Sequence, residues 1–195
     1  NYFGKHIMTT QNDETALGQG SSVKMETQET MKIIAAGNIF TGTFERDGMG
    51  GILTLGRNFE CRPNKLKGYY KYTSAKVSVS KGHLNEGEDD LCSLYIALTD
   101  EQITVNTNKG IYFDPNSSAV IAYGSISDEE SKGADSFKEF TVDLEYKDLK
   151  RIPKYIIVVA SSSKYGDYME GGKGSTMWLD DLELVYPKSM EEVRK

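Results

Sequence analysis

Short hydrophobic stretches recur along the chain and are separated by turns rich in Gly, Asn, Asp and Ser. Apolar and β-branched stretches bounded by such turns are typical of β-strands. The pattern therefore predicts strands over residues 22–29, 32–37, 42–44, 52–55, 66–73, 93–99, 111–113, 120–127, 139–146, 155–161 and 177–186.

The segments between these strands show no amphipathic helical pattern. Parallel strands need crossovers of about a dozen residues or more, which are usually helical, so the pattern excludes an α/β fold. The strand spacing instead predicts an all-β fold, a β-sandwich of jelly-roll type with very little helix. We expect one short turn at 148–151 and a charged tail at 190–195.

Two of the predicted strands differ in how they should be buried. The segment 155–160 is apolar on both faces, which predicts a central strand covered on both sides. The segment 65–72 alternates instead, with Leu66, Tyr70 and Tyr72 on one face and polar residues on the other. One face of that sheet should therefore be solvated.

Composition supports a single core. The 195 residues are 38% hydrophobic and 27% charged, and we find no repeat or linker, so we expect one jelly-roll domain over 1–195 with an ordered core at about 18–186. A net charge of −6 argues against nucleic acid as a partner, because binding phosphates requires a basic surface. No apolar run approaches the roughly 18 residues of a membrane span.

The two cysteines, Cys61 and Cys92, could form a disulfide or remain separate buried thiols. Two cysteines in a chain of this length do not define a disulfide framework, so we expect them to be unpaired.

Several stretches closely resemble the putative carbohydrate metabolism domain family of Bacteroides-like bacteria. They are AGNIFTGTF at 36–44, CRPNKLKGYYKY at 61–72, LYIALTD at 94–100, VASSSKYGDY at 159–168 and MWLDDLELVY at 177–186. The resemblance extends over about 18–186 and departs at 55–59, where LGRNF stands in place of FGRPF.

The resemblance implies a galactose-binding-like jelly roll and carries no established catalytic residues. It further implies the C-terminal part of a longer exported protein, located in the periplasm or on the outer membrane as a surface lipoprotein. The expected partner is a poly- or oligosaccharide, and a neighbouring domain of the same protein is a second one.

The glycine-rich loop at 161–174 is the first candidate binding site. It carries Lys164, Tyr165, Asp167 and Tyr168. Sugars present an apolar C–H face and a ring of hydroxyls, so an aromatic platform beside charged groups suits them. The alternative is a structural connection whose tyrosines pack back onto the edge of the sandwich.

The polar face of the 65–72 strand is the second candidate. Lys67 and Tyr69 line it, with Arg62 at its entry, and the cations would suit an acidic sugar. The alternative is an ordinary solvated face protected by lysines.

Asp180 is a candidate metal ligand. If Trp178, Asp180, Leu182 and Leu184 share the inner face of the last strand, Asp180 is buried and needs either hydrogen bonds or a cation. It would then be a ligand of a structural Ca²⁺ or a cap for loop N–H groups. We expect Trp178 itself to lie in the core, and no cofactor is required.

These features predict a non-catalytic carbohydrate-binding module of an exported glycan-utilisation protein. A first alternative is a glycoside hydrolase or lyase, which needs opposed carboxylates that only folding could bring together. The acidic runs at 86–90 and 128–130 lie in turns, and Asp100 has no evident partner. A second alternative is a structural or adhesive surface module.

Overall fold

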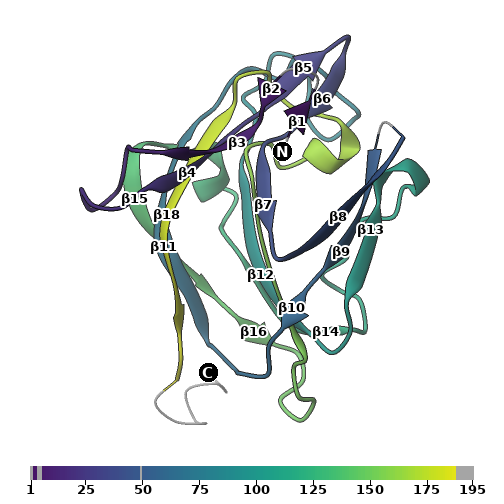
Figure 1. Cartoon of the computed structure of the whole chain (residues 1–195), viewed down its shortest axis with the longest axis vertical. Helices are drawn as coiled ribbons and strands as arrows, with labels where there is room; N and C mark the ends of the chain where they lie inside the picture. Colours follow the sequence, from purple (N-terminus) through teal and green to yellow (C-terminus); the bar gives the residue numbers. More distant parts are fainter. Residues whose placement is uncertain (1, 4–5, 49, 188–195) are drawn as a thin grey trace.

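The computed structural model describes residues 2–3, 6–48 and 50–187 and consists of three layers of antiparallel strands (Figure 1). The first layer is a five-stranded sheet of β15 (Ala134–Asp143), β11 (Lys65–Thr73), β18 (Thr176–Val185), β4 (Ser22–Glu26) and β3 (Thr9–Asn12). The second is a six-stranded sheet of β10 (Arg57–Asn58), β17 (Tyr155–Ser161), β12 (Ser93–Thr99), β14 (Val120–Ser125) and β16 (Glu145–Tyr146), with β7 (Asn38–Phe40) also paired to β17.

The third layer is a three-stranded sheet of β13 (Ile103–Asn106), β9 (Gly50–Leu55) and β8 (Gly42–Asp47). Two small hairpins complete the fold: β1 (Tyr2–Phe3) with β2 (His6–Ile7), and β5 (Gln28–Thr30) with β6 (Ile33–Ala35). Within the described ranges the helices are the short 3₁₀ turns η1 (Thr107–Lys109), η2 (Glu130–Lys132) and η3 (Gly166–Tyr168). The predicted all-β sandwich with very little helix is confirmed.

Strand β17 is covered on both faces, as its apolar pattern predicted. Ile156 and Ala160 contribute to the core between the five- and six-stranded sheets. Ile157 and Val159 pack on the other face, in a smaller apolar cluster with Leu55 of β9. The three-stranded sheet therefore supplies the cover that a strand apolar on both sides requires.

The alternation predicted for β11 is also observed. Leu66, Tyr70 and Tyr72 are buried, and Tyr70 meets Phe140 of β15 edge-to-face with ring centroids 6.0 Å apart. The lysines of the same strand lie on the outer face.

Several element boundaries differ from the sequence prediction. The expected strand 22–29 divides into β4 and β5, because Thr27 turns inward and hydrogen-bonds Ser162 and Ser163. The expected strand 111–113 reduces to an isolated bridge at Ile111, and 148–151 is a bend in which Asp148 accepts backbone N–H groups rather than a helical turn. The predicted tail at 190–195 lies outside the described residues.

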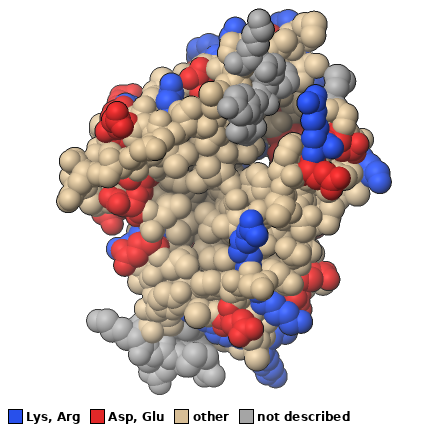
Figure 2. Space-filling model, in the orientation of Figure 1, with Lys and Arg blue, Asp and Glu red and all other residues tan. Residues whose placement is uncertain are grey.

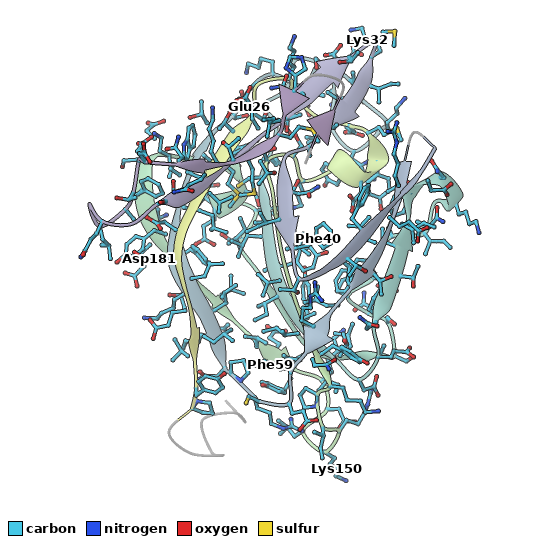
Figure 3. All side chains as sticks on the ribbon, in the orientation of Figure 1. Glu26, Lys32, Phe40, Phe59, Lys150 and Asp181 are labelled. Carbon is cyan, nitrogen blue, oxygen red and sulfur yellow. The ribbon has the colours of Figure 1, made fainter. Side chains whose placement is uncertain are left out.

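A bulge in β18 corrects the predicted faces of the last strand. Asp181 has a φ of 47°, and the pairing with β11 shifts register between Tyr69↔Asp180 and Lys67↔Glu183. Because the bulge inserts one extra residue, Leu184 faces the core whereas Trp178 and Asp180 lie on the opposite face, so the shared face was wrong. Figure 3 shows Asp181 on this sheet.

The expectation that Trp178 lies in the core is also wrong. It pairs with Lys71 on β11 and Lys24 on β4, in a row on the outer face. The Lys71 ammonium lies 4.4 Å from the centroid of the indole ring, so a cation covers part of the ring.

Cys61 is exposed and Cys92 is buried, and both are free, which confirms the unpaired prediction. Among the described residues, no helix has the length and apolar character needed to cross a bilayer.

We expect Ile157→Ala to lower the free energy of unfolding by about 2–5 kcal/mol and Ile157→Val by about 0.5–1.5 kcal/mol, because Ile157 is fully buried between the second and third layers. Urea denaturation followed by circular dichroism measures both. If both variants lowered the free energy of unfolding by the same small amount, close packing of the third layer would be contradicted.

Candidate functional site

A cavity of about 590 Å³ opens where the third layer diverges from the six-stranded sheet. Its walls are the β5–β6 hairpin, β7, the β8–β9 hairpin and η3. Beyond the cavity, the apolar cluster around Leu55 and Ile157 fills the space between the same two sheets. Figure 2 shows the surface hollowed on this face of the molecule. The volume lies within the roughly 300–1,000 Å³ typical of small-molecule sites.

One wall of the cavity carries an exposed aromatic ring. Phe44 of β8 is 60% exposed, although it lines the cavity. Its ring lies against Gly51 of β9, where an added Cβ would come within 2.1 Å of Phe44 Cε2. A side chain at this position would clash with the ring, so only glycine lets Phe44 pack this closely against the hairpin while much of the ring stays exposed.

Phe40 forms a second aromatic part of the wall. It stands on β7 between the six-stranded sheet and the β8–β9 hairpin (Figure 3). It packs on the cluster around Leu55 and is partly buried. Arg46 lines the cavity from β8, with its Nε donating to Gly48 O at 3.2 Å.

Asp167 brings a carboxylate into this apolar surrounding. It lies on η3 and lines both the large cavity and a smaller adjoining one of about 50 Å³. Asp167 is exposed to solvent, and partial burial of its carboxyl by the neighbouring protein raises the pKa of that carboxyl. Within the described part of the chain, no group donates a hydrogen bond to this carboxylate, so it can accept one from a ligand.

Aromatic stacking fixes the position of η3. Tyr165 stacks on His83 with ring centroids 4.4 Å apart, and Tyr168 stacks on Tyr112 at 4.0 Å. The predicted residues Tyr165 and Tyr168 therefore lie beside the cavity as supports of Asp167 and do not line it. Lys164 lines the smaller cavity and pairs with exposed Asp128 at 3.0 Å.

A buried carboxylate holds the neighbouring loop against η3. Glu170 is fully buried and accepts backbone N–H groups from Lys81, His83 and Leu84, and His83 Nδ1 lies 3.1 Å from the same carboxylate. Burial acts to raise the pKa of Glu170, but these hydrogen bonds outweigh it and hold the pKa below its usual value. His83 is thereby placed to stack on Tyr165.

The second predicted site divides between two places. Lys67 pairs with Glu139 of β15 at 3.7 Å on the outer face of the five-stranded sheet, where Tyr69 also lies. Arg62 instead lies over the ring of Tyr146 in the six-stranded sheet, at 5.7 Å from its centroid. The structure therefore does not bring these three residues together.

Asp180 is held by backbone donors. One carboxylate oxygen accepts the Ala16 N–H at 2.8 Å and the other the Asp181 N–H at 3.0 Å. No group of three or more His, Cys, Asp or Glu side chains suited to a metal occurs among the described residues. Capping explains the buried carboxylate, and the residues described around it do not form the oxygen shell that Ca²⁺ prefers. Calcium at Asp180 stays a prediction that chelator titration of thermal unfolding would test.

Sequence reasoning missed Phe40, Phe44 and Arg46 because the cavity forms between segments distant from the 161–174 loop. One signal was available. An aromatic residue diagonal to a glycine across a hairpin, as Phe44 is to Gly51, indicates a ring lying on the glycine.

Comparison with known proteins decides the family. The family described as “Putative carbohydrate metabolism domain” matches residues 4–185. The chain belongs to this family. It is therefore a carbohydrate-metabolism-related domain with a β-sandwich fold. No curated protein matches the chain.

Two solved structures share the fold of this carbohydrate metabolism domain. A putative glycoside hydrolase from Bacteroides thetaiotaomicron matches with a TM-score of 0.75 and 24% identity, over 94% of this chain and 58% of that one. A putative glycoside hydrolase from Bacteroides vulgatus matches with a TM-score of 0.72 and 24% identity, over 91% and 77%. The domain thus spans little more than half of the first of these structures.

We expect Asp167→Asn to raise the free energy of unfolding at neutral pH, because burial raises the pKa of Asp167 and so disfavours its charged form in the folded state. The gain should shrink as the pH falls through the raised folded-state pKa. The gain in stability should vanish below the pKa of about 3.9 that the carboxyl has in the unfolded state. Urea denaturation across this pH range measures the effect, with Asp135→Asn on β15, which lines neither cavity, as the control. A loss of stability at neutral pH would contradict the assignment.

Proposed function

We propose that this domain is a non-catalytic carbohydrate-binding module of an exported glycan-utilisation protein, and that the cavity binds part of a poly- or oligosaccharide. The observation that carries the proposal is the exposed ring of Phe44 in the wall of a cavity whose described lining contains a single carboxylate, Asp167.

The chemistry of the wall suits a sugar ring. A pyranose has an apolar C–H face that packs on an aromatic ring, and Phe44 offers a ring that is exposed and packs against Gly51. Its hydroxyls need polar partners around the edge. Asp167 accepts hydrogen bonds and Arg46 donates them, so both kinds of partner line the same cavity.

The arrangement favours binding over catalysis. Glycoside hydrolysis ordinarily uses two carboxyl groups on opposite sides of the scissile bond. Of the described residues that line either cavity, Asp167 is the one that carries a carboxylate. A lyase would need a base, and Tyr95 in the smaller cavity is a poor one because burial strongly raises its pKa.

A purely structural or adhesive module would not need such a cavity. The hollow instead combines an exposed aromatic ring with a carboxylate that has no hydrogen-bond donor among the described residues. Export to the periplasm or the outer-membrane surface, and a neighbouring domain in the same protein, complete the proposal.

We expect Phe44→Ala to weaken glycan binding by about 1–2 kcal/mol, or roughly five- to thirtyfold in Kd, because it removes the stacking surface. A glycan array identifies a ligand and calorimetry then measures the affinities. Tyr186→Ala is the matched control, because this exposed aromatic residue directly follows β18, which ends at the opposite end of the sandwich from the β5–β6 hairpin (Figure 1).

Three results would contradict the proposal in different ways. No binding across a broad array would favour the structural module. Equal losses for Phe44→Ala and Tyr186→Ala would place the site elsewhere. Shortening of a glycan during incubation would show catalysis.

A further inference from the structure

The two cavities adjoin. Asn38, Phe40, Leu53 and Asp167 line both of them. The large cavity is wide enough for a sugar ring, and the smaller one extends from it between the six-stranded sheet and the third layer. A ring seated in the first would therefore direct a substituent into the second.

The smaller cavity has a donor and an acceptor. Asp167 supplies a carboxylate without a hydrogen-bond donor from the described residues, and Lys164 lines the cavity with its ammonium group 3.0 Å from Asp128 Oδ1. Lys164 already pairs with Asp128, but Asp128 is 94% exposed, so that ion pair is weak and leaves further N–H donors.

The remaining lining is partly apolar. Leu55, Val105 and Val159 contribute side chains from three strands. At about 50 Å³ the space exceeds the roughly 10–15 Å³ that one water needs and admits about four non-hydrogen atoms. The substituent that fits is small, with a polar and an apolar end.

We propose that the smaller cavity receives the acetamido group of an N-acetylated sugar whose ring lies against Phe44. The amide N–H would donate to Asp167, the carbonyl would accept from Lys164, and the methyl group would meet the apolar side chains. This inference rests on the proposed carbohydrate-binding function.

Other common substituents fit less well. A hydroxyl group leaves the apolar part of the cavity unfilled. A carboxylate would face Asp167, and an ammonium group would face Lys164, so each meets a like charge. The acetamido group has both hydrogen-bonding partners and no net charge.

The test is an NMR titration of the full chain with methyl glycosides of N-acetylglucosamine, N-acetylgalactosamine and N-acetylmannosamine, each beside its parent hexose and its free amino sugar. We expect one acetamido sugar to bind roughly tenfold more tightly than its parent hexose, since one charge-assisted hydrogen bond is worth about that factor.

Each other outcome has a distinct meaning. Equal or tighter binding of the parent hexose would overturn this inference and leave the carbohydrate-binding function standing. Tightest binding of the free amino sugar would show that Asp167 acts as a counter-ion for the ammonium group, and this result would also overturn the inference. No binding by any of the sugars would contradict both.

A variant pair separates a direct contact from a general charge effect. Lys164→Gln should remove most of the preference for the acetamido sugar. Lys132→Gln should leave it unchanged, because Lys132 at the end of η2 forms a comparable surface ion pair with Glu129 and does not line the cavity. A preference that survives Lys164→Gln would contradict the proposed contact.

Discussion

Burial of the six-stranded sheet on both faces is the constraint on which the rest of the structure depends. Ile156 and Ala160 of β17 require the five-stranded sheet, while Ile157 and Val159 require a cover on the other side. A two-layer sandwich cannot supply that second cover, so β8, β9 and β13 fold back as a third layer. Where this layer stops touching the sheet, the cavity begins.

The other side of the cavity depends on how the loop after β17 is anchored. Asp90 is fully buried and accepts hydrogen bonds from Ser163 Oγ at 2.6 Å and Gly172 N at 2.8 Å. Burial raises the pKa of Asp90, against the opposing effect of these hydrogen bonds. Two buried carboxylates, Asp90 and Glu170, thus hold the two sides of η3 and leave Asp167 between them unpartnered among the described residues.

Sequence reasoning could predict the fold because the decisive strands carry their burial pattern in a few consecutive residues. The alternation of β11 and the double-faced apolar pattern of β17 needed no knowledge of distant neighbours. The bulge at Asp181 could not be predicted in this way, since its register depends on pairing with β11. Reading β18 as a regular strand therefore placed Trp178 on the wrong face.

The candidate site was predicted in part. The 161–174 loop drew attention through its residue types, and Asp167 and Lys164 do line cavities. Tyr165 and Tyr168 instead stack on His83 and Tyr112, and the exposed ring is Phe44, more than 100 positions away from Asp167 in the sequence. Such an arrangement arises from tertiary packing, which the local pattern does not record.

Sugar binding in this cavity is tested most directly by a map of amide chemical shifts during titration with a glycan that the domain binds. If the sugar lies in the cavity, the largest changes occur at the β8–β9 hairpin and at η3. Changes confined to the outer face of β11, around Lys67 and Tyr69, would contradict binding in the cavity.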